Sequence, residues 1–283
     1  MSYDQYESFA ENSQIAYEKK QRQAALFKQA DIIFAVGPLL RDALRDLLTG
    51  SRPIHMLIPG LAEIEPQRAP LTFTAFLSGR LSNDAARIKQ GQLGIAAFAR
   101  AHYEALENGM PENLCANPKL VLRGVDFETT ADKSSLARES DTETELKKFA
   151  EEYAQSVINL HVLPYTQDRK MLNADLSASS VVLMPSWHEG FGLVAWEAIA
   201  AGVPLIISKN SGVYRLLEET HPGAGPGCVY MIQVRGAVSE PYFHQEDLKS
   251  VISALKTIAN NPDTIPSPGL LPGKFFPPCF FGL

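Results

Sequence analysis

The chain has 283 residues, of which 45% are hydrophobic and 20% charged, so it can form one large or two modest globular domains. Its formal net charge of −6 argues against a surface dedicated to nucleic acid, since no basic stripe runs along the sequence. The three cysteines are unpatterned and neither a signal peptide nor a run of about 18 apolar residues occurs, which predicts a cytoplasmic protein without disulfide bonds or a transmembrane segment.

Residues 1–62 predict a small unit of their own. The segment 4–30 is rich in Gln, Glu, Lys and Ala and lacks Pro and Gly, which favours a helix. The segments that follow are expected to form a buried strand over 31–37, a helix over 38–48 that opens with Pro38, and a strand over 55–58. Pro66 and Pro70 mark 63–71 as a linker.

From residue 72 onward, apolar strand patterns alternate with helical patterns. Strands are expected over 73–77, 120–124, 157–162, 180–184, 205–207 and 228–232, and helices over 88–106, 143–155, 168–177 and 245–260. The polar stretch 132–141 is expected to form a loop, and no helix is assigned between the last two strands. This alternation predicts an α/β domain over 72–262 with a doubly wound, Rossmann-like parallel sheet. Residues 263–283 are rich in Pro, Gly and Phe and predict an irregular tail.

One βαβ unit carries most of the functional signal. The strand 180–184 ends at Pro185, a loop over 186–192 contains two glycines, and the helix after it stops at Gly202 and Pro204. Ligands of such units bind beside the helix N-terminus, where unpaired N–H groups and the positive end of the dipole favour an anion. Gly190 and Gly192 let the backbone approach that anion closely.

Two glutamates flank this turn. Glu189 lies in the loop and Glu197 lies in the helix, so about 9 Å of helical rise separates them. They are too far apart to share a proton, but they can accept hydrogen bonds from hydroxyl groups on either side of a diphosphate. The simpler alternative is a solvated glutamate pair on an ordinary βαβ crossover.

The run from Glu189 to Glu197, EGFGLVAWE, resembles the E-x7-E signature of retaining GT-B glycosyltransferases of the group 1 or family 4 type. The match continues to Gly202 and Pro204. The resemblance implies a GT-B-type α/β fold in which 72–262 is the C-terminal nucleotide-sugar-binding domain. It implies further that 1–62 is a truncated remnant of the Rossmann-like, N-terminal acceptor-side domain, because a complete domain would need well over a hundred residues. The chain is therefore expected to be a fragment or to lack the acceptor half.

The same resemblance implies a hexosyltransferase-type enzyme that moves a sugar from a nucleotide-sugar donor to an acceptor hydroxyl with retention of anomeric configuration. It needs no metal and no cofactor if side-chain cations bind the diphosphate. A segment similar to the family's G-R-(few)-K-G turn supplies Gly79, Arg80 and Lys89, although its long gap leaves Arg87 as an alternative to Lys89. In this family, Glu189 would position donor-sugar hydroxyls, Glu197 would hold the ribose, and the N–H groups of Phe191, Gly192 and Leu193 would hold the sugar or phosphate.

Other interpretations stay open. A non-catalytic nucleotide-sugar-binding or interaction module is the main rival, because much of a GT-B cleft is missing from the sequence. An NAD-dependent Rossmann enzyme is disfavoured, since no G-x-G-x-x-G follows a first strand. His161 and His188 are candidates for catalysis, but a lone histidine is more often a packing residue, and His188 is expected only to form a wall of the site. The sequence does not identify the donor base, the sugar or the acceptor.

Overall fold

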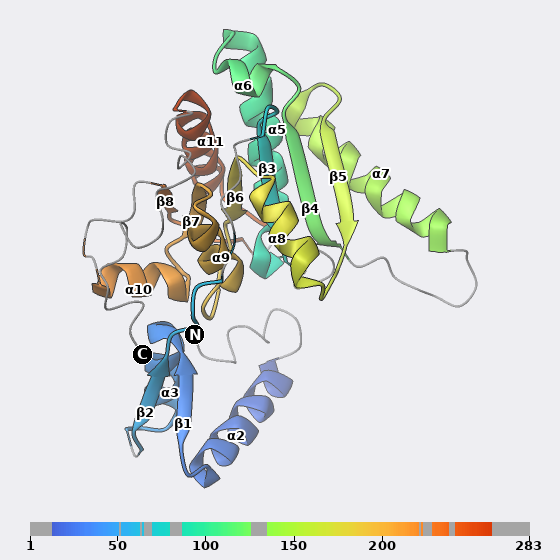
Figure 1. Ribbon diagram of the computed structural model, residues 1–283. Coiled ribbons are helices and arrows are strands. Elements are labelled where there is room, and N and C mark those ends of the chain that lie inside the picture. Colours follow the sequence, from blue (N-terminus) through green and yellow to red (C-terminus); the bar gives the residue numbers. More distant parts are fainter. Residues whose placement is uncertain are drawn as a thin grey trace.

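The computed structural model of the protein describes residues 13–50, 52–62, 64, 70–79, 87–125, 135–220, 222, 228–237 and 241–261 (Figure 1). Arg80, most of the expected linker 63–71 and the tail 263–283 lie outside these residues. Within the described part of the chain, no helix is long and apolar enough to cross a membrane.

A six-stranded parallel sheet forms the centre of the larger unit. Its strands are β3 (Thr74–Ser78), β4 (Lys119–Val125), β5 (Asn159–Pro164), β6 (Val181–Met184), β7 (Leu205–Ser208) and β8 (Val229–Ile232), in the order β5-β4-β3-β6-β7-β8. The chain adds strands outward from β3 in one direction and then resumes on its other side with β6. Ligands of open α/β sheets bind outside the carboxyl ends of the strands at this reversal, here between β3 and β6.

Helices cover both faces of this sheet (Figure 1). They are α5 (Gly91–Asn108), α6 (Glu112–Cys115), α7 (Ser135–Ala154), α8 (Arg169–Ser177), α9 (Leu193–Ala201), α10 (Gly212–Thr220) and α11 (Gln245–Asn260). Side chains of β6 alternate between the two faces: Leu183 joins a core with Phe98 of α5, whereas Val182 joins a core with Trp196 of α9. Both faces are apolar, which explains why β6 reads as an uninterrupted hydrophobic run and is buried throughout.

Two local predictions are wrong. The loop expected over 132–141 is helical from Ser135 onward, because α7 extends through a polar stretch of good helix formers without an apolar stripe. The structure also contains α10, which was not expected between β7 and β8. Its Val213, Leu216 and Leu217 are buried at helical spacing. A helix of nine residues contains too few apolar positions for this periodicity to stand out in the sequence.

A smaller unit precedes the large sheet. It consists of α2 (Ser13–Gln29), β1 (Ile33–Val36), α3 (Gly37–Leu47) and β2 (Ile54–Leu57). β1 and β2 pair in parallel as a separate two-stranded sheet, and Ile33, Ala35 and Ile54 turn to one face and pack against α3. Phe34 alternates to the other face, where 61% of its surface is exposed. The boundary expected between 62 and 72 stays a prediction.

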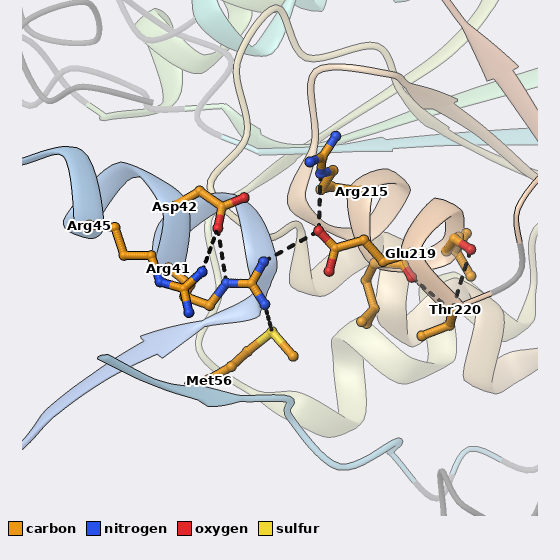
Figure 2. Close-up of polar contacts among 9 residues, drawn as sticks. Arg41, Asp42, Arg45, Met56, Arg215, Glu219 and Thr220 are labelled. Carbon is orange, nitrogen blue, oxygen red and sulfur yellow. Dashed lines mark hydrogen bonds and ion pairs between the residues drawn. The ribbon is translucent and has the colours of Figure 1, made fainter. Parts of the chain in front are cut away.

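Arg41 joins the smaller unit to the larger one (Figure 2). It lies on α3, donates to Asp42 at 2.9 Å and pairs across the interface with Glu219 of α10 at 3.4 Å. Glu219 also accepts from Arg215 of its own helix at 3.2 Å. The hydrogen bond to Asp42 raises the pKa of Arg41, so this guanidinium stays charged where the two units meet. A second connection runs from Trp196 Nε1 to the carbonyl oxygen of Pro59, at 2.9 Å.

Candidate functional site

The loop between β6 and α9 lies at the carboxyl edge of the sheet, beside the β3–β6 reversal. Backbone hydrogen bonds fix it from two sides. Trp187 N–H donates to Ile88 O at 2.8 Å, Glu189 N–H donates to Asn210 O at 3.2 Å, and Gly212 N–H donates to Glu189 O at 3.1 Å. The main chain at Glu189 is therefore held in place before any ligand arrives.

Two glycines make this packing possible. A Cβ on Gly212 would lie 2.2 Å from the carbonyl oxygen of Gly190 and 2.8 Å from Cα of Phe191, so only glycine permits α10 to begin this close to the loop. Gly192 has φ of +102° and caps α9 from the left-handed region, where glycine costs no strain. A Cβ on Gly192 would lie 2.8 Å from Cε of Met184 and 3.2 Å from Cγ of Glu189, so Gly192 makes room for side chains, whereas Gly212 permits the close approach of backbone to backbone.

Three residues predicted for the site lie together. The Lys89 ammonium forms an ion pair with Glu189 Oε2, and a Cβ on Gly79 would lie 3.4 Å from Cγ of Lys89. Arg87 contacts Tyr242 instead: its Nη2 donates to the tyrosine hydroxyl at 2.8 Å, and its guanidinium lies 4.1 Å from the ring centre. Of the two alternative cations, only Lys89 contacts the signature loop. Arg80 lies outside the described residues.

The N-terminus of α9 is open. Among the described residues, no acceptor receives a hydrogen bond from the backbone N–H of Phe191, Gly192 or Leu193, and Gly192 provides no side-chain cap. The Phe191 side chain is buried and packs edge-on against Trp196, with ring centres 5.8 Å apart. The side chain of Phe191 thus belongs to the core, and its backbone is what remains for a ligand.

Glu197 has a partner that the sequence analysis missed. Its side chain is only 8% exposed, and its Oε1 accepts from Nη1 of Arg169 at 2.6 Å. Arg169 is the first residue of α8, directly after Asp168, whose carboxylate caps the helix by accepting from Lys170 N–H at 2.9 Å. The sequence shows the helix start at Asp168, but nothing in it indicates that the next residue reaches α9.

The two candidate histidines lie in different places. His188 stacks on Trp187 with ring centres 5.1 Å apart and planes 25° apart, beside Glu189. His161 lies on the edge strand β5, among the side chains of Lys119 and Lys147, so it takes no part in this site. Burial lowers the pKa of both imidazoles.

This lowered pKa predicts a pH-dependent stability. Because the unfolded chain takes up a proton near pH 6.5 and folded His188 only at lower pH, the free energy of unfolding should fall as pH falls from about 6.5 through the folded pKa. His188→Gln should make that decline less steep. Adding His161→Gln should reduce the decline further, because the pKa of His161 is also lowered in the folded protein. Urea denaturation at several pH values between 7 and 5 measures the free energy of unfolding for each variant. An unaltered slope in His188→Gln would contradict the assignment.

No cluster of three or more His, Cys, Asp or Glu side chains suited to a metal ion occurs in the part of the chain that the structure describes. The cations near Glu189 and Glu197 are instead Lys89 and Arg169.

The sequence resembles those of known glycosyltransferases. The sequence model of a family described as "Family 4 Glycosyltransferase in conflict systems" matches residues 1–266. Over 92 residues the chain is 33% identical to a D-inositol 3-phosphate glycosyltransferase of Streptomyces coelicolor, which covers 32% of this chain and 16% of that protein. A D-inositol 3-phosphate glycosyltransferase of Streptomyces bingchenggensis is 43% identical over 60 residues, or 21% of this chain and 13% of that protein.

The fold also resembles a solved structure. A UDP-forming α,α-trehalose-phosphate synthase from Burkholderia xenovorans, in complex with glucose-6-phosphate, superposes with a TM-score of 0.55 at 14% identity. The match covers 89% of this chain and 59% of that chain. Together with the parallel sheets, this likeness confirms the predicted α/β fold of GT-B type.

Proposed function

The chain belongs to the family 4 glycosyltransferases of conflict systems, and from this membership we propose that it binds a nucleotide sugar and transfers the sugar to an acceptor hydroxyl with retention of configuration. The observation that carries the proposal is the arrangement around Glu189. Its carboxylate, the Lys89 ammonium and the open N-terminus of α9 meet at the strand reversal, where an α/β sheet binds its ligand.

The difficult chemical step is departure of the nucleoside diphosphate, which leaves with growing negative charge. Lys89, the N–H groups at the start of α9 and the positive end of that helix would stabilise this charge, with Arg80 as a second cation. These groups supply positive charge without a metal, so we propose metal-independent transfer. Glu189 would hold donor-sugar hydroxyls, because a carboxylate fixed in advance orients a hydroxyl better than a mobile one.

Glu197 would bind the ribose of the donor. Its carboxylate is buried on α9 and pairs with Arg169 through one oxygen, so the other oxygen can accept hydrogen bonds from two neighbouring hydroxyls. The nucleotide would then lie across the α9 N-terminus, with its sugar end at Glu189 and its nucleoside end at Glu197.

Calorimetric titration with UDP, GDP and ADP, each with and without EDTA, tests the binding half of this proposal. One of the three should bind, with an affinity that EDTA does not alter. Glu197→Ala should weaken that binding about 10- to 100-fold, the contribution of hydrogen bonds to a charged group. Glu107→Ala, at the exposed far end of α5, serves as the control and should bind like wild type. Absence of binding for all three nucleotides, or equal losses in both variants, would refute the proposal.

A non-catalytic nucleotide-sugar-binding module is the second candidate. The chain spans 59% of the length of the Burkholderia synthase, so the activity of a whole glycosyltransferase is a proposal here. Both candidates bind the nucleotide, so only turnover distinguishes them. The nucleotide sugar is incubated with the protein and a mixture of acceptors, and release of the nucleoside diphosphate supports the enzyme.

A further inference from the structure

The two oxygens of the Glu197 carboxylate have different environments. Oε1 accepts the hydrogen bond from Arg169 at 2.6 Å. No described residue donates to Oε2. Among the described residues, the fully buried side-chain atoms that lack a partner are Oε1 of Gln90 and Oε1 of Gln92, and Glu197 Oε2 is not one of them. Among the described residues Oε2 is therefore unpaired and not fully buried, so a ligand can reach it, although the side chain as a whole is 8% exposed.

Both partners are mounted on fixed elements. Glu197 lies within the run of α9 from Ala195 to Ala201, which is buried at every position. Arg169 begins α8, and the cap formed by Asp168 fixes that end of the helix. The Arg169 side chain is 65% exposed, so its remaining N–H donors face outward.

Resting on the proposed function, we propose that Arg169 is a positioning residue for ribose recognition: by holding Oε1 of Glu197, it keeps Oε2 directed toward the 2′ and 3′ hydroxyls of the bound nucleotide. A free carboxylate turns about its last torsion and samples several orientations. A carboxylate held by an arginine at one oxygen offers the other in a single direction, and such preorganisation raises affinity without any new contact to the ligand.

This role differs from direct phosphate binding, which an exposed arginine at a helix start could also provide. A positioning role acts through Glu197 alone, so it changes the recognition of the ribose hydroxyls and leaves recognition of the diphosphate untouched. A phosphate contact would change the affinity for pyrophosphate itself. The two roles therefore make opposite predictions for a ligand without ribose.

The test compares three ligands by calorimetry: the nucleoside diphosphate that wild type binds best, its 2′,3′-dideoxy counterpart and inorganic pyrophosphate. Wild type should prefer the ribonucleotide about 10-fold or more, as expected for a charge-assisted hydrogen bond. In Arg169→Ala this preference should shrink toward that of Glu197→Ala, with pyrophosphate affinity unchanged. The double variant should lose nothing beyond Glu197→Ala, because Arg169 acts only through that carboxylate.

Two further variants complete the design. Arg169→Lys keeps a donor and a positive charge, so it should restore part of the preference. Lys170→Ala removes an exposed cation from the next position of α8 and should behave as wild type. Thermal unfolding of each variant confirms that it is folded.

An unchanged preference in Arg169→Ala, a preference that survives in Glu197→Ala, or an equal loss for pyrophosphate would overturn the positioning role. If wild type binds none of the nucleotides, the proposed function fails and this inference fails with it. If wild type binds and Glu197→Ala loses the preference while Arg169→Ala retains it, only the role of Arg169 is refuted.

Discussion

Glu189→Gln is expected to lower kcat/KM for sugar transfer by about 10²- to 10³-fold while leaving the fold intact. The substitution keeps the size of the side chain but removes the charge that pairs with Lys89 and that, in the proposed function, orients the donor sugar. The loop itself should persist, because the backbone N–H and carbonyl of Glu189 make the hydrogen bonds to Asn210 and Gly212. The substitution is therefore expected to change catalysis without changing the stability of the fold.

The measurement uses the nucleotide sugar whose diphosphate binds best in the titrations. Glu219→Gln is the matched control, since this residue is also a partly exposed glutamate paired with a cation, but it lies at the far end of α10. It should retain activity within about twofold, because a surface ion pair contributes little. A Glu189→Gln enzyme with wild-type turnover would exclude the carboxylate from the reaction.

Gly212→Ala is expected to have the largest effect on stability, lowering the free energy of unfolding by about 3 kcal/mol. The new Cβ would meet the carbonyl oxygen of Gly190 at 2.2 Å and Cα of Phe191 at 2.8 Å. Both are backbone atoms, so no change of rotamer relieves the overlap, and the loop or α10 must move. Nucleotide affinity should fall as well, since the same shift displaces Glu189 and the start of α9.

Urea denaturation measures the stability change, and Gly60→Ala provides its control. No heavy atom lies within 4 Å of a Cβ at Gly60, so the same chemical change there should alter stability by less than about 1 kcal/mol. If the two alanine variants are equally stable, the result contradicts the close contact of Gly212 with the backbone of Gly190 and Phe191.

Much of the fold follows from local patterns. The uninterrupted apolar runs of β6 and β7 predicted buried parallel strands, and the helix expected over 245–260 has the bounds of α11. Where the local pattern was weak, the prediction failed: the first turns of α7 lack an apolar stripe, and α10 is short. For α10, the packing of its buried face, which no window of sequence contains, decides whether the helix forms.

The site was predictable only in part, for the same reason. Spacing placed Glu189, Gly192 and Glu197 around one helix start, since all three belong to a single βαβ unit. The partners of the two glutamates come from distant segments: Lys89 lies 100 residues before Glu189, and Arg169 lies 28 residues before Glu197. A motif could suggest Lys89, but the pairing of Arg169 with Glu197 depends on how α8 packs beside α9.

α10 contacts both the candidate site and the smaller unit. At its first residue, Gly212 is bonded to Glu189, and near its last turn Glu219 is bonded to Arg41 of the smaller unit. Nine residues of helix form a stiff rod about 13 Å long. The smaller unit and the backbone of Glu189 therefore contact opposite ends of one short helix.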